Sequence, residues 1–274
     1  MEPTLPRLEP MTVGSLLDRA FRMYGGNFAL MLGIVAVSYV PIYAVSLALN
    51  AWAMTVGGEN AIYIKAGAQL VILLLGGLIA YPLSEGAAIV AVSERYLGRP
   101  ASIGQAYRQA LRRWGTILNA QISVGLRVLL GLILLIVPGV IWALNYSVTV
   151  PAVMLEGLKA TDAMRRSKEL TLGERSKVLS IMFVIGALFF VVGIAMAVAV
   201  SMVIALDTPG GELVLEVTSD LAQLFTSPLG VIAPILLYYD FRIRKEGFDL
   251  EMLSQAMAHG SAAGTSATPA APGI

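Results

Sequence analysis

The chain contains no cysteine, a single histidine and few charged residues. The absence of cysteine excludes disulfides, thiolate metal sites and cysteine nucleophiles. The histidine, His259, lies in a stretch of Gly, Ala, Ser, Thr and Pro that we expect to be disordered, so Ser-His catalysis and histidine-ligated metals have no good candidate. Charged residues make up only 14% of the 274 residues, about half the share of a soluble domain, which indicates a membrane protein.

What the chain does contain is long apolar runs. Residues 27–53, 66–92, 178–206 and 213–240 are each long enough to cross a membrane, and we expect a loop at 54–65. The run 117–155 would be about 58 Å long as one helix, nearly twice the hydrocarbon thickness. Two short spans joined by a turn at Val137-Pro138-Gly139 fit better, which makes six spans in three hairpins.

Each pair of spans follows a more polar segment with the apolar periodicity of a surface helix. In Ser102–Gly115 the stripe is Ile103, Ala106, Tyr107, Ala110, Leu111 and Trp114. Thr12–Tyr24 carries a matching stripe at positions 90 lower, and Ala160–Gly173 carries a weaker one. Such helices are typical of elements that lie flat at a membrane surface.

These matches indicate an internal repeat. We predict one membrane domain over 12–251, built from repeat units near 12–95, 101–155 and 160–245. A polar segment, 1–11, precedes it, and a disordered tail, 252–274, follows it. The predicted fold is therefore all-α and polytopic, with an amphipathic helix before each hairpin.

The basic residues indicate how the protein is oriented. Three lie before the first span, five in 93–116, six in 156–177 and three after Asp240, so 17 of the 19 Lys and Arg share one side. By the positive-inside rule that side is cytoplasmic. We predict a multi-pass protein of the inner (cytoplasmic) membrane with both termini in the cytoplasm.

Two charges, Glu85 and Arg127, lie deep in the predicted second and third spans. Both would lie about 15 Å from the cytoplasmic ends of adjacent antiparallel spans, so an ion pair is plausible. It would be either a structural pin or a polar site for a proton, ion or ligand, to which Asn145 of the fourth span is a further candidate. We expect Glu216 and Asp220 near the outer interface.

The basic helices predict contact with anionic lipid headgroups, worth about 1 kcal/mol for each Lys or Arg near the surface. These residues also serve to enforce topology, and the two roles can hold together. The candidates for headgroup contact are Arg22, Arg108, Arg112, Arg113, Arg165, Arg166 and Lys168.

Two stretches carry a family resemblance. Residues 163–173, AMRRSKELTLG, fit a pattern A-x-x-x-S-x-x-L-T/V-x-G, and residues 236–251, LLYYDFRIRKEGFDLE, fit a C-terminal signature. The chain thereby resembles the bacterial membrane family described as glycerophosphoryl diester phosphodiesterase membrane domain. The signature residues are Tyr239, Asp240, Arg242, Arg244, Lys245 and Glu246. The resemblance implies a membrane module alone, since no catalytic barrel follows, and no catalytic residue is carried over.

The leading hypothesis is a non-enzymatic integral membrane module that contacts anionic phospholipid and partner proteins. The alternative is a small transporter or channel with a polar site around Glu85 and Arg127. An intramembrane enzyme ranks last, for want of a nucleophile beside a base. We expect no metal, no cofactor and no nucleic-acid partner.

Overall fold

The computed structural model describes residues 9–205 and 211–247, which are almost entirely α-helical and contain no β-strand. The predicted tail 252–274, His259 and most of the polar segment 1–11 lie outside these residues. Within them, six helices are long and apolar enough to cross a membrane: Phe28–Val56, Gly58–Tyr96, Ile103–Leu134, Ile136–Glu156, Arg175–Ala199 and Val214–Glu246. The predicted all-α fold is confirmed, and it is compatible with a multi-pass membrane protein.

The first hairpin is tighter than predicted. Helix α1 (Val13–Gly26) starts at Thr12, whose side chain forms a capping box with Ser15, and α2 (Phe28–Val56) follows. Helix α3 (Gly58–Leu75) begins almost at once, so the predicted loop over 54–65 is wrong. Gly57 and Gly58 have φ of +66° and +60°, a region that glycine enters without steric cost, and this allows the chain to reverse within one residue.

A proline explains an irregular turn inside the second apolar helix. Between α3 and α4 (Tyr81–Tyr96), residues Gly76–Ala80 form one turn of π-helix. Pro82 has no N–H, so it cannot donate to the carbonyl of Leu78 four residues earlier. The indole Nε1 of Trp114 donates to that carbonyl instead, at 3.0 Å. A side chain from another helix thus satisfies the backbone group that the proline releases.

Ser102–Gly115, predicted to be a separate surface helix, continues without a break into the third apolar run. Helix α5 (Ile103–Leu134) has no break after Gly115, and Ser102 caps its first turn. The chain then reverses at Leu135 into α6 (Ile136–Asn145), so the turn predicted at Val137-Pro138-Gly139 lies inside α6. The two helices touch at a glycine pair, because a Cβ on Gly131 would lie 2.7 Å from Gly139 Cα.

The remaining helices are α7 (Thr149–Glu156), α8 (Ala160–Thr171), α9 (Arg175–Ala205) and α10 (Gly211–Glu246). In the stripes predicted for the surface helices, Leu16 and Ala20 of α1 are buried, as are Ala106 and Ala110 of α5. These positions are 90 residues apart, which agrees with the repeat, although the repeat itself stays a prediction. In α8 the buried positions include Ala163.

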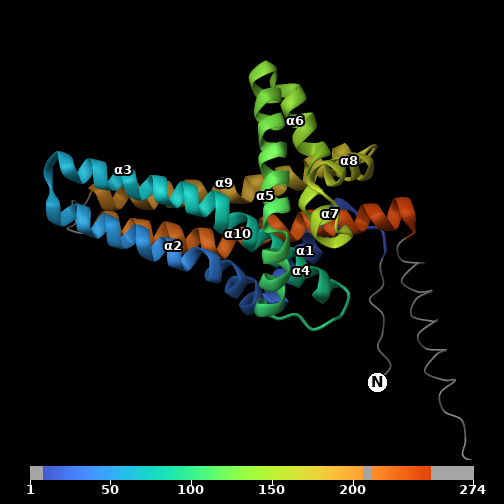
Figure 1. The fold of residues 1–274 in the computed structure, drawn as a ribbon, viewed down its shortest axis with the longest axis horizontal. Coiled ribbons are helices and arrows are strands. Elements are labelled where there is room, and N and C mark those ends of the chain that lie inside the picture. Colours follow the sequence, from blue (N-terminus) through green and yellow to red (C-terminus); the bar gives the residue numbers. More distant parts are fainter. Residues whose placement is uncertain (1–8, 206–210, 248–274) are drawn as a thin grey trace, which may run out of the picture.

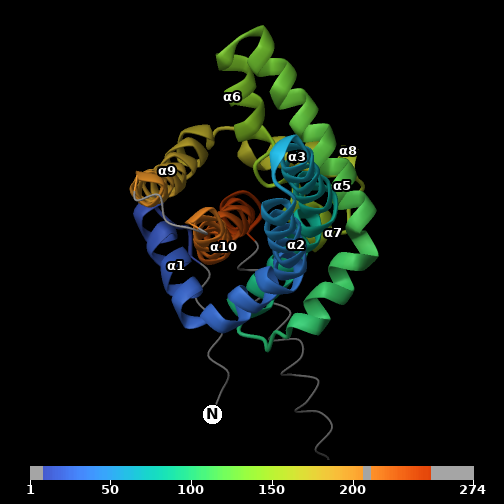
Figure 2. The same cartoon turned by 90° about the vertical axis from the view of Figure 1, so that its left-hand side faces the viewer.

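The helices form three parts. Figure 1 shows α2, α3, α9 and much of α10 running along the long axis, a group we call the arm, and in Figure 2 α10 lies between α9 and the pair of α2 and α3. At one end of the arm, α1, α4, α7, α8 and the last turns of α10 form a part that we call the hub. The hairpin of α5 and α6 stands across the arm, and Figure 2, in which the arm helices are seen nearly end-on, shows the same crosswise direction.

Candidate functional site

The hub is held together around one fully buried carboxylate, Asp240 of α10. Asp240 accepts hydrogen bonds from the backbone N–H of Met11 at 2.6 Å and from Arg244 Nε at 3.1 Å, and it pairs with Lys177 of α9. Arg244 also donates to the carbonyl of Met11 at 2.7 Å. The buried charge is thereby compensated by two cations, and these contacts tie α9 and α10 to the chain just before α1.

A second group of charges joins α7, α8 and α10. Arg166 Nε donates to both oxygens of Glu156 at 2.9 Å, and Arg166 Nη2 donates to Glu246 at 2.8 Å. Glu156 also accepts from the hydroxyl of Tyr238, and Glu246 from Arg242. The hydrogen bonds to Glu246 and Glu156 raise the pKa of Arg166 above its ordinary value, against the effect of desolvation. Arg166 therefore holds three helices together.

The two family-like stretches meet in the hub. Lys245 donates to the carbonyls of Glu169 and Leu172 at the end of α8, at 2.8 and 2.6 Å. Tyr239 is buried, hydrogen-bonds to Ser93 and stacks on Tyr96, with ring centroids 4.8 Å apart. The C-terminal signature residues thus lie at contacts between helices, and one of them, Arg244, also borders a pocket of about 340 Å³ beside Met11 and Lys177.

Asn145 belongs to the hub, not to an intramembrane site with Glu85. It is buried at the end of α6, and its Oδ1 accepts from Arg175 Nε at 2.8 Å. Its backbone carbonyl accepts from Ser167 Oγ at 2.8 Å, and Ser167 Oγ accepts from the N–H of Val148 at 3.2 Å. These bonds satisfy backbone groups where α6 ends and the chain turns into α7.

The predicted ion pair between Glu85 and Arg127 does not form. Glu85 of α4 accepts a hydrogen bond from Gln121 of α5, six residues before Arg127. Arg127 is exposed on α5 and donates to the carbonyl of Ser123 at 2.9 Å. The structure therefore gives Glu85 a polar partner but leaves Arg127 exposed.

The predicted headgroup residues divide into two groups. Arg22 pairs with Asp18, Arg165 lies 3.5 Å from Asp162, and Arg166 is engaged in the hub. Over residues 9–205 and 211–247, no ion pair involves the other four, Arg108, Arg112, Arg113 and Lys168. Three of those four lie on α5.

Two of the unpaired arginines line a pocket. A concavity of about 490 Å³ lies between α5 and α7 and is bordered by Gln109, Arg112, Arg113, Thr116 and Met154. A Cβ on Gly157, at the end of α7, would lie 2.8 Å from Arg113 Nη2, so this guanidinium lies directly over the glycine. We call this site the arginine pocket. It presents two guanidiniums, an amide and a hydroxyl, a donor set suited to a phosphate.

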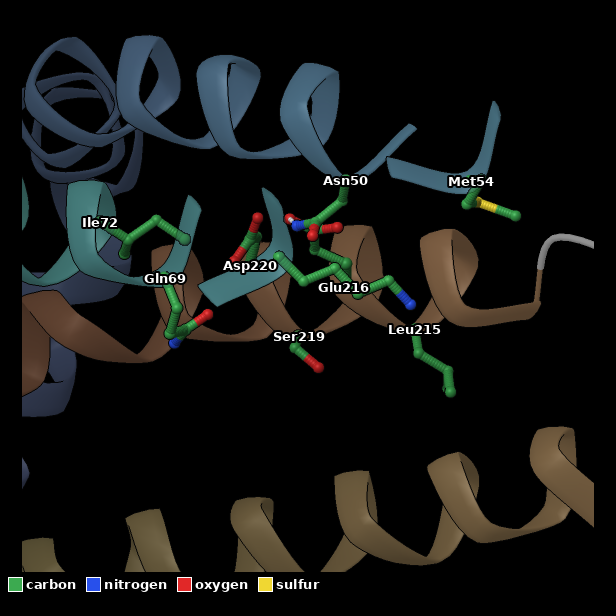
Figure 3. A pocket seen from close by; sticks show the side chains of 9 residues that line it. Asn50, Met54, Gln69, Ile72, Leu215, Glu216, Ser219 and Asp220 are labelled. Carbon is green, nitrogen blue, oxygen red and sulfur yellow. Dashed lines mark hydrogen bonds between the residues drawn. The ribbon is translucent and has the colours of Figure 1, made fainter. Parts of the chain in front are cut away.

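A second polar pocket, which the sequence did not predict, lies in the arm. It has a volume of about 390 Å³ between α2, α3 and α10, and it contains the carboxylates of Glu216 and Asp220 together with Asn50, Lys65, Gln69 and Ser219. Glu216 Oε1 accepts from Ser46 Oγ at 2.6 Å and from Asn50 Nδ2 at 2.9 Å. Figure 3 shows Glu216, Asp220 and Asn50 converging between the helices.

The sequence contained a signal for this carboxylate pocket. Glu216 and Asp220 are four residues apart, so they share one face of α10, and polar residues within an apolar helix usually face the bundle interior. Asn50, Met54 and Lys65, which border the pocket, lie near the α2–α3 turn, and the expectation that both carboxylates lie near the outer interface stays a prediction. In the part of the chain that the structure describes, no group of three or more His, Asp and Glu could hold a metal ion.

Comparison with known proteins does not identify a relative. No family model, curated protein or solved structure matches the chain, so the family resemblance stays a prediction.

Proposed function

We propose that this chain is a non-enzymatic integral membrane module that binds anionic phospholipid headgroups, and partner proteins, at its basic surface. That surface would face the cytoplasm of a bacterium, with both termini on the same side of the inner membrane. The distribution of Lys and Arg, 17 of 19 on that side, supports the orientation. We also propose membership of the glycerophosphoryl diester phosphodiesterase membrane domain family, supported by the contacts between the two family-like stretches.

The observation that carries the proposal is the arginine pocket. A structural arginine is normally engaged by a carboxylate, as Arg166 is, but Arg112 and Arg113 have no acidic partner among the described residues. Unpaired guanidiniums lose no existing bond when they bind a phosphate, and together they can hold it in several hydrogen bonds. Trp114, on another side of the same helix, is 37% exposed and is an aromatic of a kind enriched at membrane interfaces.

The lack of cysteine makes a direct test possible, because any cysteine introduced is a unique labelling site. We would place a bimane fluorophore on Gln105→Cys, one turn before the arginine pocket, in lipid nanodiscs. Brominated phosphatidylglycerol or brominated phosphatidylcholine is then added in increasing mole fraction. Bromine quenches at short range, so quenching reports which headgroup stays near the pocket. We expect phosphatidylglycerol to quench at a lower mole fraction.

The variant R112Q/R113Q should remove this preference. At about 1 kcal/mol for each arginine, the loss of two corresponds to roughly 30-fold weaker selection. The matched control is R22Q/R165Q, which removes two arginines that already have acidic neighbours and should stay within about twofold of the parent. Equal loss in both double variants, or no preference in the parent, would contradict the proposal.

A second candidate function follows from the carboxylate pocket. The pocket of about 390 Å³ holds two carboxylates and two amides against one ammonium, that of Lys65, so its excess of negative charge suits a small organic cation. The transporter alternative thereby moves from Glu85 and Arg127 to Glu216 and Asp220. Ethidium, a fluorescent cation, would probe it. We expect E216Q/D220N to abolish ethidium binding while E59Q, at the exposed start of α3, leaves it unchanged. Binding that survives E216Q/D220N would eliminate this candidate.

A further inference from the structure

The α5–α6 hairpin runs across the arm helices, so its apolar length alone does not show that it crosses the membrane with them. Helices that cross one bilayer tilt by about 20° on average and rarely beyond about 40° from its normal. The arm helices run together, whereas α5 and α6 stand across them in both views (Figures 1 and 2). If the arm crosses the membrane, the hairpin cannot follow the same normal.

The stretch Ile136–Glu156 is long enough to cross in total, but it is divided into α6 and α7, and α6 alone is too short. Helix α6 has 10 residues, which is about 15 Å and half of the hydrocarbon thickness. After Asn145 the chain turns and enters α7, where Thr149, Val150, Pro151, Ala152 and Val153 are all buried in the hub. Extending α6 into a span would require those residues to leave the hub core.

Helix α5 has different surroundings on its different sides. Its arginine-pocket side, with Arg112 and Thr116, borders Met154 of α7 and therefore faces the hub. Another side carries Trp114, which donates to Leu78 in the long α3–α4 helix and therefore faces the arm. A third side packs against α4, where Ala110 and Ile117 contact Gly86.

The side chains of α5 match these surroundings. At about 100° per residue, one sector of about 100° carries a polar series along most of the helix. Its members are Arg108, Arg112, Thr116, Asn119, Ser123 and Arg127. Toward the tip the same sector also holds Leu126 and Leu130, which are 56% and 55% exposed, so the polar side ends before the tip. The neighbouring sector, which contains Trp114, presents Leu111, Ile122 and Leu129, which are 60%, 47% and 54% exposed. The polar side thus faces the hub and the exposed apolar side faces the arm.

We infer that the α5–α6 hairpin lies in the plane of the membrane, in the leaflet nearest the hub, and that its partner is the lipid interface. Only α2, α3–α4, α9 and α10 then cross the bilayer. The apolar side of α5 enters the acyl chains, and its polar side lies at the headgroups, as in helices that lie on a membrane. The tip, where Ile133, Leu134 and Ile136 are at least 71% exposed, is apolar on all sides and enters the same leaflet.

The test is a depth profile along α5 in zwitterionic nanodiscs, which makes it independent of headgroup charge and of the proposed lipid selectivity. Single cysteines L111C, I122C and L129C carry a fluorophore in turn, and quenching is compared between lipids spin-labelled near the headgroup and at mid-chain. Leu111 and Leu129 are about 27 Å apart along the helix, close to the full hydrocarbon thickness. L179C and F190C on α9 provide a matched pair in a helix that crosses.

For a hairpin in the plane, the ratio of headgroup to mid-chain quenching should agree within about twofold at all three α5 positions, while the two α9 positions differ clearly. A maximum of mid-chain quenching at Ile122 would show that α5 crosses the bilayer and would overturn the inference. Loss of quenching by both lipids, with excimer formation between pyrene-labelled copies at Leu129, would also overturn it, since a second chain would then cover this face.

Discussion

The arginines of the hub and those of the hairpin differ in what surrounds them. Arg166 in α8 contacts two carboxylates and is mostly buried. Arg112 and Arg113 in α5 border a pocket, and neither forms an ion pair with another described residue. Both sets fall in segments predicted to lie on the cytoplasmic side, and the sequence does not distinguish them. Pairing separates arginines that hold helices together from arginines that remain available to a ligand.

Buried and exposed ion pairs should also differ in how much they contribute to the free energy of unfolding. Removing one partner of a buried pair leaves an uncompensated charge, which costs several kcal/mol, whereas an exposed pair contributes little. Substitutions in the hub should therefore unfold the protein, and those on the outer face of the hairpin should leave it folded.

The largest effect should come from Asp240→Asn. The substitution removes the charge that compensates Lys177 and Arg244, and the Lys177 side chain is only 9% exposed, so we expect a loss of about 3–5 kcal/mol in the free energy of unfolding. Thermal unfolding in detergent measures it. Asp18→Asn, which removes the exposed partner of Arg22, is the control and should cost less than about 1 kcal/mol. A similar loss of unfolding free energy for both variants would show that the buried Asp240 stabilises the protein no more than an exposed carboxylate does.

A double-mutant cycle on Glu156 and Arg166 should show a smaller but clear coupling. E156Q leaves Arg166 with fewer acceptors and R166Q leaves two carboxylates facing each other, so the double variant should cost about 1–2 kcal/mol less than the two single costs together. The same cycle on Asp162 and Arg165, exposed on the same helix, should couple by less than about 0.5 kcal/mol. Additive costs at Glu156 and Arg166 would contradict the hub account.

The contact between hairpin and hub should be sensitive to volume at Gly86. A Cβ there would lie 2.7 Å from Ile117 Cδ1 and 3.2 Å from Ala110 Cβ, so Gly86→Ala should destabilise by about 1–2 kcal/mol. Adding Ile117→Val removes the Cδ1 and should recover part of the loss. Gly125→Ala, where nothing lies within 4 Å, is the matched control on α5 and should be close to neutral. No difference between G86A and G125A would mean that α5 is not docked at Gly86.

The apolar runs predicted the helices well, because span length and composition are local properties of the chain. Pairings between distant segments were not predictable in the same way. Asp240 bonds to Met11, 229 residues away, and no local pattern indicates that contact. The predicted ion pair between Glu85 and Arg127 does not form, because equal distance from the span ends brings two residues together only when both helices run along the same membrane normal. Since α5 runs crosswise, the position level with Glu85 is Gln121.

The central claim is that the hairpin stays on the side of its arginines. It is tested most directly by labelling Leu135→Cys, at the tip, with a membrane-impermeant maleimide. Glu59→Cys, beside the α2–α3 turn at the far end of the arm, and Arg99→Cys, between α4 and α5, mark the two sides. We predict that intact cells label residue 59 alone. Inverted vesicles should label residue 99 and leave residue 135 unlabelled until detergent is added, because the tip lies in the acyl chains of that leaflet. Labelling of residue 135 together with residue 59 in intact cells would show that the hairpin crosses the membrane and would contradict the account.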